Sequence, residues 1–223
     1  MLTLFCGYDY REAIGYHVFT NSVLRHSTVP VSFVPLSSYG LSEGTNAFTL
    51  SRFLIPFLTR YNGKVIFADA SDMLMLGDIA DLLPELDNLK SPVAVVKHNY
   101  KTRNPRKYIG TPMEADNIDY PKKNWASFML INAAHPYWKI ATPQKIEEMP
   151  KKYWLEFQFL PESEVVEINS KWNRLVDEGQ PANGAKILHW TAGIPYFPFY
   201  DQAPCADLWK KELQILLGQS PYT

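Results

Sequence analysis

Short apolar runs alternate with helix-like segments along the first half of this chain. Runs of strand length lie at residues 2–6, 31–34, 64–68 and 93–97. Between the first two runs, apolar side chains recur at helical spacing at Tyr16, Phe19 and Val23. Strands that alternate with helices form largely parallel sheets, because each helix carries the chain back across one face of the sheet. We therefore expect an α/β fold with a doubly wound, mostly parallel central sheet and helices on both faces.

Length and charge narrow the class of protein. The 223 residues suit one domain, which we expect to span 1–223. A net charge of −1 argues against stable nucleic-acid binding, which usually shows a basic stripe. No apolar run approaches the roughly 20 residues of a membrane span. The two cysteines, Cys6 and Cys205, are far apart in sequence, which favours buried thiols and a reducing, cytoplasmic location. The oligomeric state stays open.

Residues 98–125 interrupt the alternation of strands and helices. Lysine and arginine are interleaved there with tyrosine and tryptophan, over a length that exceeds an ordinary connection. Aromatic faces suit sugar rings, and basic groups suit phosphates. We expect an acceptor-binding or lid segment there, with a solvated irregular loop as the alternative. An amphipathic C-terminal helix is expected over 205–217.

Two aspartates follow the third apolar run. Asp69 and Asp72 stand at the carboxyl end of a predicted strand, where ligands bind in open α/β sheets. Carboxylates are ligands that Mg²⁺ and Mn²⁺ prefer, and such ions share their coordination with substrate phosphates. A cation at this place would stabilise the charge on a departing diphosphate. The alternative is that either aspartate only caps a turn or a helix.

A histidine ends a late apolar run. His189 follows Ile187 and Leu188, and the chain continues through Gly193 and Pro195. An imidazole at a strand end can complete a mixed oxygen and nitrogen metal site. A hydrogen-bonded histidine near the core is the alternative.

Together these segments resemble the family 8, glycogenin-like glycosyltransferases, which have the GT-A fold. The donor-site stretch of that family is similar to Arg52-Phe53-Leu54-Ile55-Pro56 followed by residues 64–79. The family's C-terminal histidine segment is similar to residues 189–196, and residues 5–13 look like the start of a bacterial and phage group. Residues 120–132 and 172–175 also fit that group. The likeness covers nearly the whole chain, in the family's order.

The resemblance implies a hexosyltransferase that uses a nucleotide-sugar donor, with a UDP-sugar favoured and retention at the anomeric carbon. The acceptor, a hydroxyl of a glycan, protein or other molecule, is not specified. The implied cofactor is Mn²⁺ or Mg²⁺, held by Asp69, Asp72 and His189. The implied donor-binding residues are Tyr8, Asp9, Arg11, Arg52, Lys97, Lys123, Gly193 and Pro195. We expect Gln158 and Asn132 near the sugar as catalytic residues.

Several of these residues also have plain structural interpretations. Gln158 suits an exposed amide, Tyr8 a core side chain, and Asp9 a helix cap paired with Glu12. Arg52 suits a surface ion pair, or a brace for the aspartates.

Two positions depart from the family pattern. The family has Asp-x-Asp, whereas this chain has one more residue between Asp69 and Asp72. A one-residue bulge would bring Asp69 back to the metal. The family's lysine after the histidine is also missing, since Ile194 stands there. A phosphate contact would then come from Lys97, Lys123 or Arg11.

Two other functions remain open. A non-catalytic nucleotide-sugar or glycan-binding protein would explain the altered aspartate spacing as a lost metal site. A nucleotidyltransferase also pairs aspartates with an α/β sheet. It should carry a glycine-rich basic loop after the first strand, and residues 7–11 contain one glycine and one arginine.

Overall fold

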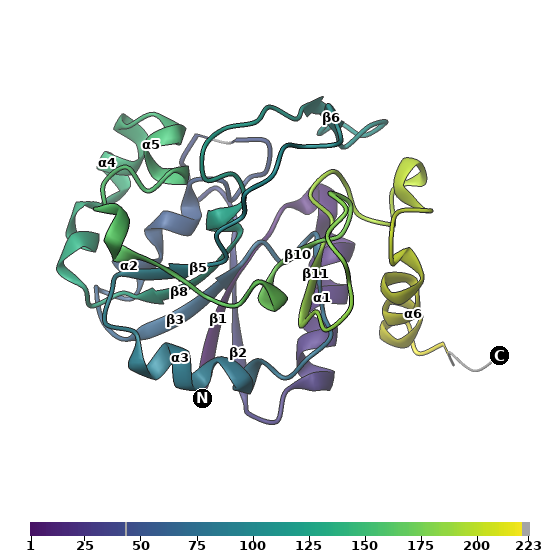
Figure 1. The fold of residues 1–223 in the computed structure, drawn as a ribbon, viewed down its shortest axis with the longest axis horizontal. Coiled ribbons are helices and arrows are strands. Elements are labelled where there is room, and N and C mark those ends of the chain that lie inside the picture. The colour runs from purple at the N-terminus through teal and green to yellow at the C-terminus, as the bar shows by residue number, and fades with distance from the viewer. Residues whose placement is uncertain (43, 220–223) are drawn as a thin grey trace.

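The computed structural model describes residues 1–42 and 44–219. The strands are β1 (Leu2–Gly7), β2 (Val31–Leu36), β3 (Lys64–Ala68), β4 (Met73–Met75), β5 (Val93–Val95), β6 (Arg106–Lys107), β7 (Ala115–Asp116), β8 (Phe128–Asn132), β9 (Val165–Glu167), β10 (Arg174–Leu175) and β11 (Ile187–His189). The α-helices are α1 (Ala13–His26), α2 (Ile55–Leu58), α3 (Leu83–Asn88), α4 (Pro143–Glu148), α5 (Lys151–Leu155) and α6 (Ala206–Leu216). Figure 1 shows the helices grouped around a central sheet.

The central sheet has the strand order β2-β1-β3-β8-β5-β9. β1 pairs in parallel with β2 and β3, and β5 pairs in parallel with β9. β8 runs antiparallel to both of its neighbours, β3 and β5. Five strands therefore run one way and one the other, which confirms the expected mostly parallel sheet.

Both faces of this sheet are covered, because successive side chains of a strand point to opposite faces. Val65 and Phe67 of β3 belong to the core beneath α2, α4 and α5. Ile66 and Ala68 belong to the core beneath α1 and α3. In Figure 1, α2, α4 and α5 lie together on one side of the sheet and α3 lies on the other. The expected helices on both faces are confirmed.

A second, smaller sheet carries the late apolar run. β11 pairs in parallel with β10 and antiparallel with β4. The late apolar run that ends at His189 is confirmed as a strand, but its place outside the central sheet is not visible in the sequence. The register sets His189 opposite Met73, and Trp190 N–H donates to Asp72 O at 2.9 Å. The histidine thus lies beside the residue that precedes β4.

Local signals explain several element boundaries. Asp78 and Thr142 cap their helical segments by accepting from the N–H groups of Ala80 and Lys145. The segment around Pro56 forms a short 3₁₀ turn, Ser51–Leu54, followed by α2. Proline lacks an N–H and is tolerated only in the first turn of a helix, so α2 begins next to Pro56.

The capping pair expected at the first helix forms only in part. Asp9 accepts from Arg11 N–H and caps the short turn Tyr10–Glu12. Glu12 does not reach back to it. Its side chain is completely buried and accepts from Asn46 Nδ2 at 3.0 Å.

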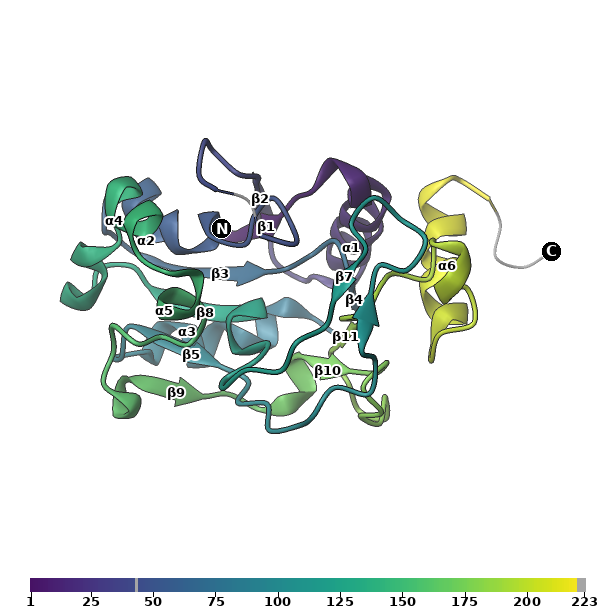
Figure 2. The ribbon, with the colours of Figure 1, turned by 90° about the horizontal axis from the view of Figure 1, so that it is seen from above.

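Residues 98–125, here called the strap, form a long excursion with one short hairpin, β6 paired with β7. In Figure 1 the strap passes over the top of the molecule, and Figure 2 shows it from above, crossing beside β4 and β11. It is fastened to the chain beyond His189, because Tyr108 N–H donates to Ala192 O at 2.6 Å and Ile109 N–H donates to Tyr200 Oη at 3.0 Å.

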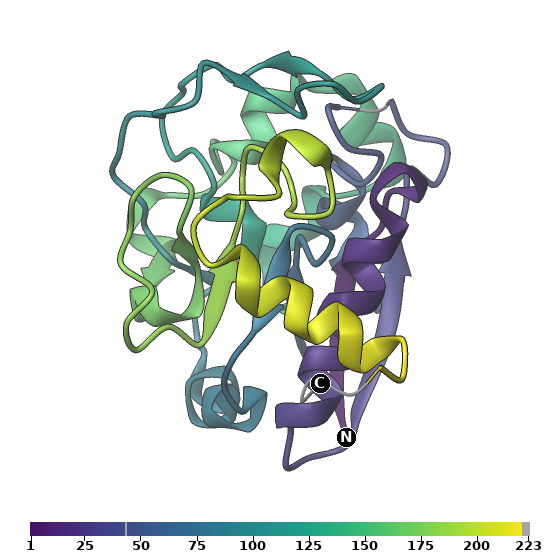
Figure 3. The same ribbon diagram turned by 90° about the vertical axis from the view of Figure 1, so that its right-hand side faces the viewer.

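The C-terminal helix and the thiols match expectation. α6 lies against α1 (Figure 3), where Asn21 and Arg25 both contact the Glu212 carboxylate. Cys205 precedes α6 as its N-cap and is partly buried, whereas Cys6 is fully buried, and both thiols are free.

None of the described helices has the length and apolarity needed to cross a bilayer.

Candidate metal and donor site

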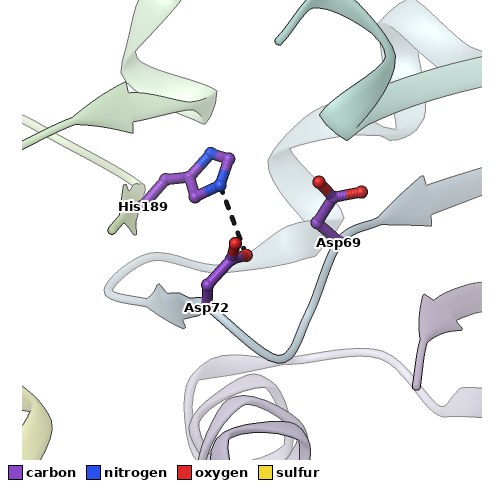
Figure 4. Close-up of side chains that lie close together, drawn as sticks. All are labelled: Asp69, Asp72 and His189. Carbon is purple, nitrogen blue, oxygen red and sulfur yellow. Dashed lines mark ion pairs between the residues drawn. The ribbon is translucent and has the colours of Figure 1, made fainter. Parts of the chain in front are cut away.

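Asp69, Asp72 and His189 come together at the carboxyl end of β3. Each offers one ligand atom, and these atoms lie within 4.8 Å of one another. Figure 4 shows the three side chains facing a common point, with His189 Nε2 at 3.3 Å from Asp72 Oδ1. Ligand atoms bound about 2.1 Å from one Mg²⁺ lie roughly 3–4 Å apart, so a small inward movement of these side chains would bring all three onto one cation.

A tight turn takes up the extra residue between the aspartates. Ser71 N–H donates to Asp69 O at 2.6 Å, and Met73 N–H donates to Ala70 O at 3.0 Å. Ala70 adopts a left-handed conformation with φ +56°. That conformation costs a residue with a Cβ roughly 1–2 kcal/mol. The turn, in place of the expected bulge in a strand, returns Asp72 to the side of Asp69.

Helix α1 supports this turn from behind. A Cβ atom placed on Gly15 would lie 1.9 Å from Ser71 O, which is a backbone atom. Only a residue without a side chain lets the helix come this close. The position of Asp72 is therefore coupled to the packing of α1.

Each of the two carboxylates has one buried oxygen that accepts no hydrogen bond. Asp69 Oδ1 and Asp72 Oδ1 are buried without a hydrogen bond. Arg52 Nη1 lies 2.6 Å from Asp69 Oδ1, an ion pair without hydrogen-bond alignment. Arg52 is itself held over the rings of Phe48 and Phe67 and donates to Ala126 O at 2.8 Å. Buried oxygens that lack donors need another partner, and a divalent cation fits them.

A chain of hydrogen bonds orients the imidazole. Ser127 Oγ donates to Asn124 O at 2.7 Å and so can accept from Asn173 Nδ2 at 2.8 Å. The amide oxygen of Asn173 then faces His189 Nδ1 at 2.9 Å. Nδ1 must carry the proton to donate to that oxygen, which leaves the lone pair of Nε2 toward Asp72. His189 is thus prepared to bind a metal through Nε2.

The cluster is rich in carboxylates. Burial, with help from the Asp72 carboxylate, raises the pKa of Asp69 to about 7 against the opposing effect of Arg52. Burial disfavours a charged imidazole, but Asp72 and Asp69 outweigh it and raise the pKa of His189. Burial and then the charges of Asp72 and Asp9 raise the pKa of Glu12 well above its usual value. This surplus of negative groups favours a bound cation.

We expect Mn²⁺ affinity to fall as the pH is lowered through about 7. Below its raised pKa, Asp69 keeps a proton that the cation must displace, and the raised pKa of His189 acts in the same direction. The affinity should change by up to about tenfold per pH unit for each proton released. Calorimetric titration with Mn²⁺ at several pH values measures this. An affinity independent of pH would show that neither group binds the ion.

Two adjoining cavities lie beside the cluster, under the strap. The first, about 150 Å³, is lined by Arg52, Asp69 and Lys107 together with other residues. The second, about 210 Å³, shares Lys107, Tyr120 and other residues with the first. A third cavity of about 520 Å³ is lined by residues 98–101 and 119–123 of the strap. Asp69 is thus the member of the cluster that lines the first cavity, and residues of the strap line all three cavities.

Several predicted donor-binding residues lie near the ends of the same strands. Asp9 and Arg11 pair with each other at 2.6 Å, and Asp9 Oδ2 accepts from Ala47 N–H at 2.9 Å. They thereby fix the loop whose residues Thr45 and Asn46 line the first cavity. Tyr8 follows β1 directly, and its ring packs edge-on against Tyr16.

Lys97, Lys123 and Gly193, also predicted to bind the donor, have protein contacts of their own. Lys97 lies over the ring of Trp125. Lys123 is buried, donates to Asn117 Oδ1 at 2.8 Å and lines the second and third cavities. Gly193 lies against the ring of Tyr200, where a Cβ would collide. Pro195 is also buried, and neither of these two lines any of the three cavities.

The structure does not bring the two expected catalytic amides to the cluster. β8 runs antiparallel to β3, so Phe128 pairs with Ala68 at the site and Asn132 pairs with Lys64. Four residues of strand, roughly 13 Å, thus separate Asn132 from the aspartates. Gln158 is exposed and donates to Glu156 at 3.0 Å.

Sequence reasoning missed residues that the fold places at the site. Lys107 and Tyr120 belong to the basic and aromatic segment 98–125 that is expected to bind a ligand, but the sequence does not single out these two residues within it. The spacing of Glu12 from Asp9 predicts a capping residue, so the sequence does not indicate that Glu12 is buried beside the aspartates. Asn173 stands within a segment that carried the family likeness, which was the available signal.

No protein-family model matches the chain. Protein CDI of Arabidopsis thaliana is 32% identical over 227 residues, which cover 95% of this chain and 85% of that protein.

Solved glycosyltransferases have similar structures. The bifunctional glycosyltransferase WbbM matches with a TM-score of 0.62 at 15% identity, over 95% of this chain and 49% of WbbM. GlyE of Streptococcus pneumoniae matches with a TM-score of 0.61 at 16% identity, over 97% of this chain and 62% of GlyE. The galactosyltransferase LgtC, solved with donor and acceptor sugar analogues, matches with a TM-score of 0.60 at 14% identity, over 96% of each chain. The chain therefore spans about half of WbbM and somewhat less than two thirds of GlyE. At these identities the likeness shows the GT-A fold.

Proposed function

Because this chain belongs to the same family as protein CDI of Arabidopsis thaliana and has the GT-A fold, we propose that it is a glycosyltransferase with a nucleotide-sugar donor and a divalent metal cofactor. The single observation that carries the proposal is the cluster of Asp69, Asp72 and His189 beside a cavity. These residues would hold Mn²⁺ or Mg²⁺. When bound, the ion would supply Lewis-acid stabilisation of the diphosphate leaving group.

The surrounding residues would prepare the site before the donor arrives. Arg52 fixes Asp69 from one side, and Asn173 fixes the ring of His189 from the other. Arg52, Asn173 and His189 are buried and the Asp69 side chain is 13% exposed, so these contacts would set the ligand geometry before the donor binds. Residues of the strap line the cavities beside the cluster and, with a donor bound, would limit the access of water to it.

The cavity supports a retaining reaction without a carboxylate nucleophile. Among the described residues that line the first cavity, Asp69 is the one carboxylate, and it would be engaged with the cation. The acceptor hydroxyl would then attack on the face from which the diphosphate leaves, and a phosphate oxygen would take its proton. The new glycosidic bond forms as the bond from the anomeric carbon to the diphosphate breaks.

We propose that the donor binds on the side of the first cavity and that the acceptor binds in the third cavity. A UDP-sugar is the favoured donor, with its base near Tyr8 and its nucleotide near the Asp9–Arg11 pair at the end of β1. The third cavity, in the strap, is the proposed acceptor site, because its lysine and tyrosine side chains suit a hydroxylated ligand.

Purified protein should release free nucleotide slowly from one sugar in a panel of UDP-, GDP- and CDP-sugars when Mn²⁺ is present. EDTA should abolish the release, and added Mn²⁺ should restore it. The same donor should stabilise the fold by about 2.7 kcal/mol at a concentration 100-fold above its Kd, as thermal unfolding would show. Binding without turnover, across the panel and with added sugar acceptors, would favour the binding-protein alternative. Transfer of the nucleotidyl group would favour a nucleotidyltransferase.

A further inference from the structure

Lys107 is a cation in the site that none of the metal-ligand contacts uses. It lies in β6 of the strap, and its side chain lines both cavities that adjoin the cluster, the first of them together with Asp69. Among the residues that the structure describes, no hydrogen bond or ion pair engages its Nζ, whose recorded contact is the ring of Tyr108 at 5.5 Å. Burial lowers the pKa of Lys107, against the raising effect of Asp72 and Asp69. A shielded ammonium with free donors needs a partner.

The backbone holds Lys107 at a fixed place above the cluster. The neighbouring Tyr108 is 2% exposed and has φ +56°. Its N–H donates to Ala192 O at 2.6 Å, and its hydroxyl accepts from Asn46 Nδ2 at 3.1 Å. These two contacts of Tyr108, with residues remote in sequence, therefore position Lys107, which directly precedes it. The backbone at Lys107 is therefore held in place by tertiary contacts.

The other basic residues nearby are already engaged. Arg52 pairs with Asp69, Arg11 pairs with Asp9, and Lys123 donates to Asn117. The segment that follows His189, residues 190–196, contains no lysine or arginine. Lys107 lies on the part of the strap that is hydrogen-bonded to that same segment. It is thus the cation best placed to meet an anion that enters the first cavity.

We propose that Lys107 binds the diphosphate of the donor, so that the strap supplies the cation that the segment after His189 lacks. This rests on the proposed function. An anion bridging a metal at Asp69 and the ammonium of Lys107 would give both positive groups the partner they lack. As the sugar leaves, the ammonium would donate a hydrogen bond to the diphosphate that accumulates charge. The strap would then be part of the donor site as well as the acceptor site.

The competing interpretation is that Lys107 only offsets the surplus of carboxylates. In that case its loss would change metal binding and stability but would not discriminate between ligands. A diphosphate-binding role predicts instead that the loss depends on the number of phosphates in the ligand.

The test compares Lys107→Met, Lys107→Arg and wild type by calorimetric titration at saturating Mn²⁺, with inorganic pyrophosphate, UDP and uridine as probes. Lys107→Met should weaken pyrophosphate and UDP binding roughly 10- to 100-fold and leave uridine binding unchanged. Lys107→Arg keeps the charge and should retain most of the affinity. Arg103→Met removes an exposed cation of the strap that lines none of the three cavities and should bind all probes as wild type does.

Each other outcome rejects a distinct claim. If Lys107→Met binds pyrophosphate as tightly as wild type does, the role of Lys107 is overturned and the proposed function still stands. Equal weakening of uridine and UDP, or loss of Mn²⁺ binding itself, would assign Lys107 to charge balance and also overturn its role. If wild type binds neither pyrophosphate nor any nucleoside diphosphate, both the role of Lys107 and the proposed function fail.

Discussion

Replacing Asp72 by asparagine should abolish metal-dependent release of nucleotide from the donor while the protein stays folded. Asp72 is 4% exposed, and its Oδ1 faces His189 Nε2 without a hydrogen bond. Asparagine keeps the volume but removes the negative charge that attracts a hard cation. A Lewis acid contributes several kcal/mol to the transition state, so the rate should fall on the order of 10³-fold.

The stability of the metal-free variant separates loss of metal from loss of fold. Removing this charge breaks the contact with His189 but also relieves repulsion from Asp69 and Glu12. Because these two effects oppose each other, we expect the metal-free variant to stay folded and to unfold cooperatively. Asp81→Asn is the matched control, since Asp81 is exposed and pairs with Lys186 at the surface. Full activity of Asp72→Asn in Mn²⁺ would remove the cluster from the mechanism.

Gly15→Ala should destabilise the protein, although alanine normally strengthens a helix. The propensity gain is about 1 kcal/mol. The new Cβ would lie 1.9 Å from Ser71 O, so either α1 or the turn that carries Asp72 must move. Overpacking of this kind costs roughly 1–3 kcal/mol or more, and here the neighbour is backbone that no side-chain rotation can remove. We expect a net loss of stability together with weaker Mn²⁺ binding.

Thermal unfolding with and without Mn²⁺ measures both effects. Each kcal/mol lost should lower Tm by roughly 2–4 °C in a protein of this size. His17→Ala places the same residue at an exposed position of the same helix and should leave Tm and Mn²⁺ affinity close to wild type. If Gly15→Ala raises Tm as helix propensity alone predicts, the turn and the helix are less tightly packed than described.

The parts of the fold that could be predicted are those with local signals. The apolar run at 64–68 forms the predicted strand, and the caps at Asp78 and Thr142 likewise depend on residues within a few positions. The direction of β8 depends on which strands pair with it, which periodicity does not report. For this reason Asn132, a polar residue at a strand end, lies at the end of the sheet away from the aspartates.

The members of the metal cluster could be predicted because they lie at or next to the ends of strands. The geometry of the cluster could not be predicted. The turn at Ala70 requires a left-handed conformation in a residue that rarely adopts it, so no turn signal marks the position. Lys107 is set by contacts of Tyr108 with Ala192 and Asn46, which are remote in sequence. Tertiary contacts of this kind carry no periodic pattern, and only a folded structure reveals them.

The chain crosses from one sheet to the other between Asp69 and Asp72. Asp69 directly follows β3 of the central sheet, whereas Asp72 and His189 belong with β4 and β11 of the small sheet. An ion bound to all three residues would therefore link the central sheet to the small sheet. Losing the ion would therefore remove one link between the two sheets, while the apolar core that Met73, Met75 and Ile187 share with Ile66 and Ala68 would still hold them together.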